Sequence, residues 1–328
     1  MSGSERILQV EGICVDFQTR RGTVRVLNEV TLHVNQGEAL GIVGESGCGK
    51  SMTALSIMRL VPEPGKITHG RILLHGENLL NLDEKEMRDI RGNKISMIFQ
   101  EPMTALNPVF SIGKQIRESI ELHQGASKEE AAQRAIDMLQ AVGIPAAEQR
   151  IRQYPHELSG GMRQRVMIAI ALCCQPMVLL ADEPSTALDV TVQAQIFDLL
   201  VDIQKKMGTA VILITHDMGV IAEFAQRVVV MYAGRKVEEG MVETIIKSPK
   251  HPYTRGLIQC VPHLHIDPGP DRVELNEIPG VVPDLSRLGK GCPFVPRCLE
   301  AMESCKKEMP PAKRVGENHQ VACWLAGV

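Results

Sequence analysis

Residues 7–43 consist of short runs of alternating apolar and polar positions, bounded by turn residues. The runs Ile7–Val10, Ile13–Phe17 and Thr31–Val34 have the pattern of half-buried strands. The run Ala39–Val43 is apolar throughout, which is typical of a fully buried strand. This last run leads directly into a glycine-rich loop.

Downstream of that loop, apolar positions at helical spacing alternate with compact apolar runs. We predict strands at residues 71–75, 95–99, 177–181, 210–214, 228–232 and 235–237, and helices at 112–142, 161–173 and 190–206. Strands that alternate with helices indicate an α/β fold with a parallel sheet. The region of about 101–170 is mostly helical and is predicted to be inserted into that sheet.

The composition changes beyond about residue 250, where prolines become frequent and regular structure is hard to predict. We therefore predict a main domain over residues 1–250 and a separate proline- and cysteine-rich extension over residues 251–328. The helical insert belongs to the main domain.

The overall composition is that of a globular protein without a basic field for nucleic acid. The chain has 328 residues, of which 44% are hydrophobic and 3% aromatic, and its net charge is -3. The most apolar stretch, residues 166–181, is interrupted by Gln175 and Pro176 and is too short to span a bilayer. The first residues lack the apolar run of a signal peptide. We therefore expect a cytoplasmic chain that serves a membrane process only through a partner.

Residues 44–51 have the pattern of a phosphate-binding loop between a strand and a helix. Such a loop turns backbone N–H groups toward phosphate oxygens, and the following helix adds the positive end of its dipole. Lys50 is expected to reach the β- and γ-phosphates, and Ser51 to ligate Mg²⁺. Cys48 is either a reactive thiol with a lowered pKa or an inert small residue, and we favour the inert reading. The candidate nucleotide-binding residues are Gly44, Glu45, Ser46, Gly47, Cys48, Gly49, Lys50, Ser51 and Met52.

Two carboxylates follow the apolar run at residues 177–181. Asp182 is suited to hold Mg²⁺ through its outer coordination sphere. Glu183 points elsewhere because side chains alternate along a strand, and it is a candidate general base for the attacking water. Both could be solvated residues at a strand end, but a phosphate-binding loop in the same chain favours the hydrolytic interpretation.

Residues 158–161, Leu-Ser-Gly-Gly, form a second anion-binding pattern at the start of a predicted helix. One chain seldom needs two such sites for one nucleotide. Following a phosphate-binding loop and preceding Asp182, this segment resembles the signature sequence of the ATP-binding subunits of ABC transporters. The resemblance implies that the signature of one subunit closes over ATP held by another. The signature residues are Leu158, Ser159, Gly160, Gly161 and Met162.

Further motifs of that family occur in the expected order over residues 10–245. Gln100 matches the glutamine that contacts Mg²⁺ and the attacking water, and His216 matches the switch histidine at the γ-phosphate. Phe17 falls where the family places an aromatic ring that stacks on adenine. The loop that crosses the dimer interface is matched by Ser185, Ala187, Leu188 and Asp189.

The resemblance implies a fold and two cofactors. The fold is a P-loop ABC ATPase core with a parallel sheet, a small antiparallel β subdomain and an inserted helical subdomain. The cofactors are ATP and Mg²⁺, with Ser51, Gln100 and Asp182 at the metal.

Three segments narrow the resemblance to the ATP-binding subunits of dipeptide and oligopeptide importers, the DppD/OppD type. They are residues 101–108, 251–255 and 278–283. The resemblance implies a location at the cytoplasmic face of the inner membrane. The implied partners are a related ATP-binding subunit, two transmembrane permease subunits and an extracytoplasmic peptide-binding protein. Importers of glutathione or nickel complexes are the alternative within the family.

Four of the nine cysteines lie within the last 37 residues, at positions 292, 298, 305 and 323. In a reducing compartment such a set indicates a metal site rather than disulfides. Structural zinc usually has closer ligand pairs, whereas looser spacing can hold an iron–sulfur cluster. The spacing leaves the metal open; the resemblance favours a 4Fe–4S cluster over zinc. The candidate ligands are Cys292, Cys298, Cys305 and Cys323.

Three other classes of protein compete with an importer subunit. A soluble ABC ATPase of repair or translation often has long coiled-coil inserts or two fused cassettes, which this sequence lacks. A P-loop kinase or GTPase does not explain the Ser-Gly-Gly segment or His216. A redox-sensing regulator would use the cysteine set and the ATPase fold without transport.

Overall fold

The computed structural model describes residues 5–20, 22–100, 105–184, 190–261 and 277–326. The chain divides into two compact units. The first unit comprises residues 1–7, 35–38 and 81–212, and the second comprises residues 8–34, 39–80 and 213–328. Strand β8 (Ala210–Thr215) begins in the first unit and ends in the second.

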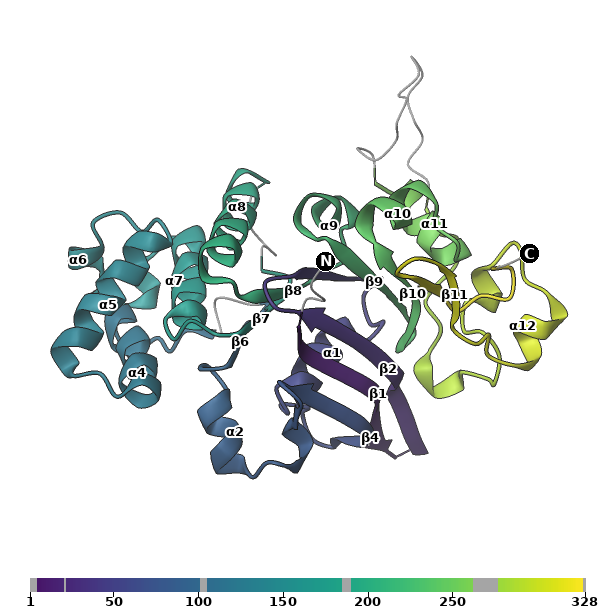
Figure 1. Cartoon of the computed structure of the whole chain (residues 1–328), viewed down its shortest axis with the longest axis horizontal. Coiled ribbons are helices and arrows are strands. Elements are labelled where there is room, and N and C mark those ends of the chain that lie inside the picture. The colour runs from purple at the N-terminus through teal and green to yellow at the C-terminus, as the bar shows by residue number, and fades with distance from the viewer. Residues whose placement is uncertain (1–4, 21, 101–104, 185–189, 262–276, 327–328) are drawn as a thin grey trace, which may run out of the picture. The chain divides into compact units, whose positions relative to one another are not determined.

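The first unit combines a parallel strand pair with a group of helices. Strands β6 (Ile95–Ile98) and β7 (Val178–Asp182) are parallel and fully buried, with Ile95 opposite Val178. Helices α4, α5 and α7 pack against one another (Figure 1). The helices are α2 (Glu84–Ile90), α4 (Ile112–Gln124), α5 (Lys128–Ala141), α6 (Ala147–Arg150), α7 (Gly160–Leu172) and α8 (Val190–Met207).

The prediction of one helix over residues 112–142 is wrong, because the chain breaks there into α4 and α5. Gly125 ends α4 in the left-handed conformation, with a φ of 62°. The Ser127 hydroxyl then accepts a hydrogen bond from the Glu130 N–H, and the Glu130 carboxylate accepts one from the Ser127 N–H. This capping box starts a new helix.

The second unit contains an antiparallel sheet with the strand order β2-β1-β4-β5 (Figure 1). Leu8 of β1 lies opposite Leu74 of β4, and the register shifts between Glu11 and Val15. The predicted short strands merge into longer ones, which are β1 (Arg6–Thr19), β2 (Gly22–Asn35), β4 (Gly65–Leu74) and β5 (Glu77–Asn78).

Another set of strands in the second unit has the order β11-β12-β10-β9-β3. Strand β3 (Ala39–Val43) is parallel to β9 (Arg227–Tyr232), and both are buried along their whole length. The remaining pairs are antiparallel, and their strands are β10 (Arg235–Met241), β11 (Lys313–Gly316) and β12 (His319–Val321). The helices are α1 (Lys50–Ile57), α9 (Met218–Phe224), α10 (Val242–Lys247), α11 (Pro252–Gln259) and α12 (Glu303–Lys307).

The C-terminal extension therefore has more regular structure than its prolines indicated. Single-turn 3₁₀ helices at Leu285–Arg287 and Val295–Arg297 lie between α11 and α12. The β11–β12 hairpin follows α12 and continues the sheet from β10. Along the parts of the chain that the structure describes, no helix is both long and apolar enough to cross a membrane.

A buried carboxylate ties this extension to β10. Glu238 is only 1% exposed and accepts hydrogen bonds from the Lys250 N–H at 2.7 Å and the His251 N–H at 3.0 Å. Its Oε1 also lies 2.8 Å from Nε2 of His319 in β12. Burial lowers the pKa of His251 to about 3, with a smaller contribution from Arg255, so its ring stays neutral. Glu238 thus holds the start of α11 and the terminal hairpin together.

We predict that Glu238→Ala lowers the free energy of unfolding by about 3 kcal/mol, because it leaves buried donors without an acceptor. Urea unfolding followed by circular dichroism measures the change. The control Glu243→Ala removes an exposed ion pair with Lys247 and should leave stability nearly unchanged, because solvent screens the two charges. Equal losses in the two variants would contradict the role of Glu238.

Candidate nucleotide-binding site

The predicted phosphate-binding loop lies between β3 and α1 and is closed by Lys50. This side chain is 5% exposed, and its Nζ donates hydrogen bonds to the carbonyl oxygens of Gly44 at 2.7 Å and Glu45 at 3.1 Å. Gly47 and Gly49 have φ values of 77° and 104°, which side chains rarely permit. The loop therefore folds back around the start of α1, as a phosphate cradle requires.

Two glycines of the loop, Gly44 and Gly49, lie so close to neighbouring strands that a side chain does not fit there. A Cβ atom at Gly44 would lie 2.3 Å from the carbonyl oxygen of Met231 in β9. One at Gly49 would lie 2.7 Å from Cδ2 of Leu27 in β2. The Cys48 carbonyl also accepts a hydrogen bond from the Gly234 N–H at 2.9 Å. The turn between β9 and β10 thus supports the loop from behind.

Cys48 is a buried member of this loop. Its side chain is fully buried, and that burial raises the pKa of its thiol despite the opposing effect of Lys50. A reactive thiolate at this position is therefore not favoured, in agreement with the preferred sequence interpretation.

The first unit brings together two of the predicted hydrolytic residues. Asp182 is the buried last residue of β7. Glu183 follows with a φ of 44°, a left-handed conformation that costs about 1 kcal/mol or more for a residue with a side chain. Its Oε2 accepts a hydrogen bond from Nε2 of Gln100 at 2.9 Å. The strained turn therefore aims the carboxylate at the glutamine that follows β6.

The signature segment forms the start of α7, as predicted. Ser159 is the N-cap, and its hydroxyl accepts a hydrogen bond from the Met162 N–H at 3.3 Å. Leu158 is buried, whereas Ser159 and Gly160 are exposed at the positive end of the helix. An anion can approach this end of α7 from solvent.

The buried side chain of Gln164 makes a contact that the sequence did not predict. Its amide donates a hydrogen bond to the carbonyl of Pro184, one residue after Glu183. Signature helix α7 and the hydrolytic segment are therefore linked directly. The predicted dimer-loop residues Ser185, Ala187, Leu188 and Asp189 lie outside the described residues.

Two predicted nucleotide-site residues of the second unit differ in exposure: His216 is exposed and Phe17 is half-buried. His216 is exposed and follows β8 directly. The next residue, Asp217, caps α9, because its carboxylate accepts a hydrogen bond from the Gly219 N–H at 2.7 Å. Phe17 in β1 is half-buried and lies opposite Gly65, and its ring occupies the space that a Cβ at Gly65 would need. The adenine-stacking role of Phe17 remains a prediction.

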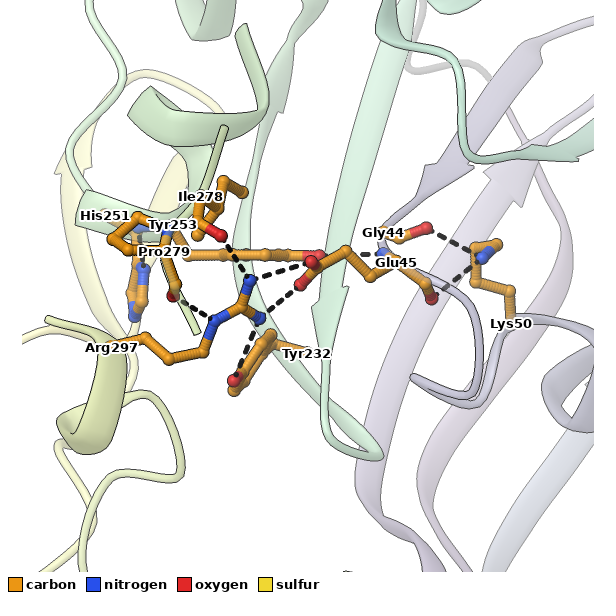
Figure 2. Close-up of polar contacts among 9 residues, drawn as sticks. All are labelled: Gly44, Glu45, Lys50, Tyr232, His251, Tyr253, Ile278, Pro279 and Arg297. Carbon is orange, nitrogen blue, oxygen red and sulfur yellow. Dashed lines mark hydrogen bonds and ion pairs between the residues drawn. The ribbon is translucent and has the colours of Figure 1, made fainter. Parts of the chain in front are cut away.

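Two residues of the C-terminal extension reach the loop and were not predicted. The Tyr253 hydroxyl accepts a hydrogen bond from the Glu45 N–H at 2.8 Å. The Arg297 guanidinium pairs with the Glu45 carboxylate (Figure 2). Burial raises the pKa of Tyr253, so its hydroxyl stays neutral. Nothing local in the sequence signals these contacts, because 208 and 252 residues separate the partners.

The four clustered cysteines line one small cavity of about 20 Å³. His251, Phe294 and Trp324 lie among the residues that enclose it. Burial raises the pKa of the Cys292 thiol to about 11. Within the described residues, no three Cys, His, Asp or Glu side chains are gathered closely enough to ligate one ion. The four residues are thus neighbours without forming a preassembled coordination site.

Comparisons with known proteins agree with this geometry. A family model described as "ABC transporter" matches residues 27–186, and one described as "Oligopeptide/dipeptide transporter, C-terminal region" matches residues 237–305. A probable peptide ABC transporter ATP-binding protein of Sinorhizobium fredii is 50% identical over 98% of this chain and 95% of its own. The oligopeptide transport ATP-binding protein OppD of Bacillus subtilis is 50% identical over 98% of this chain and 89% of its own.

A solved structure shares the fold of the cassette. The ATP-binding cassette MJ0796, a dimer bound to ADP and Pi, superposes with a TM-score of 0.65 at 30% identity. The match covers 72% of this chain and 98% of that one. The chain therefore belongs to the ATP-binding subunits of ABC transporters, within the family of peptide-import ATP-binding proteins. It is an ATPase of the P-loop class.

We predict that Gly44→Ala weakens ATP binding about tenfold or more, because its Cβ displaces the loop from β9. Titration with a fluorescent ATP analogue measures the Kd, and circular dichroism confirms that the chain is folded. Gly289→Ala adds the same methyl group where no atom lies within 4 Å and should bind like the wild type. Wild-type affinity in Gly44→Ala would show that the loop tolerates a side chain.

Proposed function

We propose that the chain supplies the energy of ATP hydrolysis for the import of dipeptides or oligopeptides. The observation that carries this proposal is the presence in one chain of both parts of such subunits: the cassette and the oligopeptide/dipeptide transporter C-terminal region. The likeness to relatives named as peptide transport proteins extends over nearly the full length. We assign the cassette to residues 1–250, with its helical subdomain at about 101–170, and the extension to residues 251–328.

In this proposal, Glu183 is the general base of hydrolysis. Its contact with Gln100 supports that assignment, because a carboxylate and an amide that share one hydrogen bond can together orient a water molecule. Lys50 binds the phosphates, and His216 contacts the γ-phosphate. Ser51, Gln100 and Asp182 would hold Mg²⁺, which neutralises charge on the phosphates.

Each subunit supplies half of every ATP site in this proposal. The exposed helix start at Ser159 and Gly160 supports the idea, because it offers a second anion site in a chain that already has a phosphate-binding loop. ATP would be enclosed between the loop of one subunit and the signature of the other. Closure with ATP and opening after hydrolysis are a two-state cycle driven by contacts with the γ-phosphate.

The partners follow from this cycle. We propose a related ATP-binding subunit, two transmembrane permease subunits and an extracytoplasmic peptide-binding protein. The chain would lie at the cytoplasmic face of the inner membrane, with the helical subdomain against the permease. The alternative cargoes, glutathione or nickel complexes, are not favoured, because the relatives are named for peptide transport.

We predict that Glu183→Gln preserves ATP binding, stabilises an ATP-dependent dimer and lowers ATP hydrolysis about 100-fold or more. Phosphate release measures turnover in the complex with its membrane partners, with and without peptide, and size-exclusion chromatography with light scattering detects the dimer. The control Glu77→Gln changes an exposed carboxylate of β5, outside the helical subdomain, and should leave turnover and the oligomeric state as in the wild type. Undiminished hydrolysis in Glu183→Gln would remove Glu183 from the catalytic role.

We further propose that Cys292, Cys298, Cys305 and Cys323 hold a metal centre, a 4Fe–4S cluster or alternatively zinc. Four thiols around one cavity are a suitable donor set for either. The spacing lacks the close pairs of zinc sites, which favours the cluster. The cavity has room for about one water-sized body, which a single ion fills more closely than a cluster does. Either centre would cross-link the extension, and a cluster would add redox sensitivity.

We predict that the protein, purified without oxygen, contains about four irons and four acid-labile sulfides per chain. Elemental analysis and the visible absorption spectrum measure this content. Cys298→Ser should lower it, whereas Cys260→Ser, whose thiol is not among the four, should retain it. One zinc per chain would establish the alternative, and no bound metal in fully folded protein would contradict a metal centre.

A further inference from the structure

The carboxylate of Glu45, the second residue of the phosphate-binding loop, is paired with an arginine of the C-terminal extension. Nη1 and Nη2 of Arg297 lie 2.6 Å and 2.9 Å from the two carboxylate oxygens of Glu45. Figure 2 shows the guanidinium facing the carboxylate on the side of the loop away from Lys50. This two-bond geometry is the strong form of an arginine–carboxylate pair.

The extension holds the guanidinium in place through backbone carbonyls. Arg297 donates to Pro279 at 2.9 Å and to Ile278 at 3.1 Å, and also approaches the Tyr232 hydroxyl at 3.4 Å. Its side chain is 3% exposed, whereas that of Glu45 is 28% exposed. The segment that begins at Ile278 therefore holds this arginine in place through its backbone carbonyls. The sequence alone assigned no structural role to this segment.

The charges of the loop explain why such a partner is needed. A phosphate-binding loop accepts a polyanion, but Glu45 places a negative charge within the loop itself. An unpaired carboxylate in this partly buried position would repel the phosphates, because little solvent screens it. Arg297 is always charged, and its hydrogen bonds with Glu45 raise its pKa further.

We propose that Arg297 is a positioning residue of the nucleotide site: it neutralises the charge of Glu45, so that the C-terminal extension sets the affinity for ATP. Arg297 acts through Glu45 and not on the reacting atoms. The contact of Tyr253 with the Glu45 N–H holds the same residue from the same extension. The proposal concerns ATP binding and does not depend on which cargo is transported.

A purely structural role predicts a different mutational pattern from charge neutralisation. If Arg297 only anchors the extension, its loss should weaken ATP binding whether or not Glu45 is charged. If it neutralises Glu45, removal of the carboxylate should compensate for removal of the guanidinium. The double variant therefore distinguishes the two roles.

The test measures the Kd for Mg-ATP of the full-length subunit by titration with a fluorescent analogue. Arg297→Gln should weaken binding about tenfold, and Glu45→Gln added to it should restore affinity to within about threefold of the wild type. In steady-state hydrolysis, Arg297→Gln should raise KM for ATP with little change in kcat. Arg255→Gln is the control, because it breaks an exposed arginine–carboxylate pair of the same extension that does not reach the loop.

Two results would overturn the proposal: wild-type affinity in Arg297→Gln, or a double variant as weak as Arg297→Gln alone. Glu45→Gln by itself provides a test should the Arg297 variants not fold. It leaves the arginine and its carbonyl contacts in place, so ATP should bind at least as tightly as to the wild type. Weaker binding by Glu45→Gln would equally reject charge neutralisation. A wild-type chain that binds no ATP would instead refute the ATPase itself.

Discussion

The close approach of the phosphate-binding loop to strand β9 is the constraint on which the nucleotide site depends. With 2.3 Å between a Cβ at Gly44 and the Met231 carbonyl, only glycine lets the chain turn at the end of β3. That turn places the carbonyls of Gly44 and Glu45 where Lys50 bonds to both. The loop and the Lys50 ammonium are thus held in one arrangement by contacts within the chain itself. A site that is ordered in advance loses less entropy on binding.

The C-terminal extension contacts this loop directly. Glu238 fastens its first helix and its last hairpin to β10. From this base, Tyr253 and Arg297 both reach Glu45. Arg297 is also the residue before Cys298, which lines the cysteine cavity. Arg297 therefore connects the candidate phosphate-binding loop with the candidate metal-binding cysteines.

The sequence predicted those features of the structure that a few adjacent residues determine, and it did not predict contacts between distant residues. The phosphate-binding loop, the helix start at Ser159 and the strand before Asp182 each depend on a few adjacent residues, and all are confirmed as local structures. The break at Gly125 was local too, but the helical composition on both sides concealed it. The pairing of Arg297 with Glu45 could not be predicted, because it spans 252 residues and an arginine followed by cysteine has many possible partners. The link from Gln164 to Pro184 was missed for the same reason.

In the proposed function, ATP hydrolysis by this chain drives peptides inward across a membrane. The most direct measurement is uptake of radiolabelled peptide by vesicles that contain the chain with its permease partners, with the peptide-binding protein and ATP on opposite sides. Our account predicts peptide accumulation against its gradient that requires hydrolysable ATP and stops with Glu183→Gln. Steady ATP hydrolysis without peptide movement, or with movement of a nickel complex or glutathione instead, would contradict it.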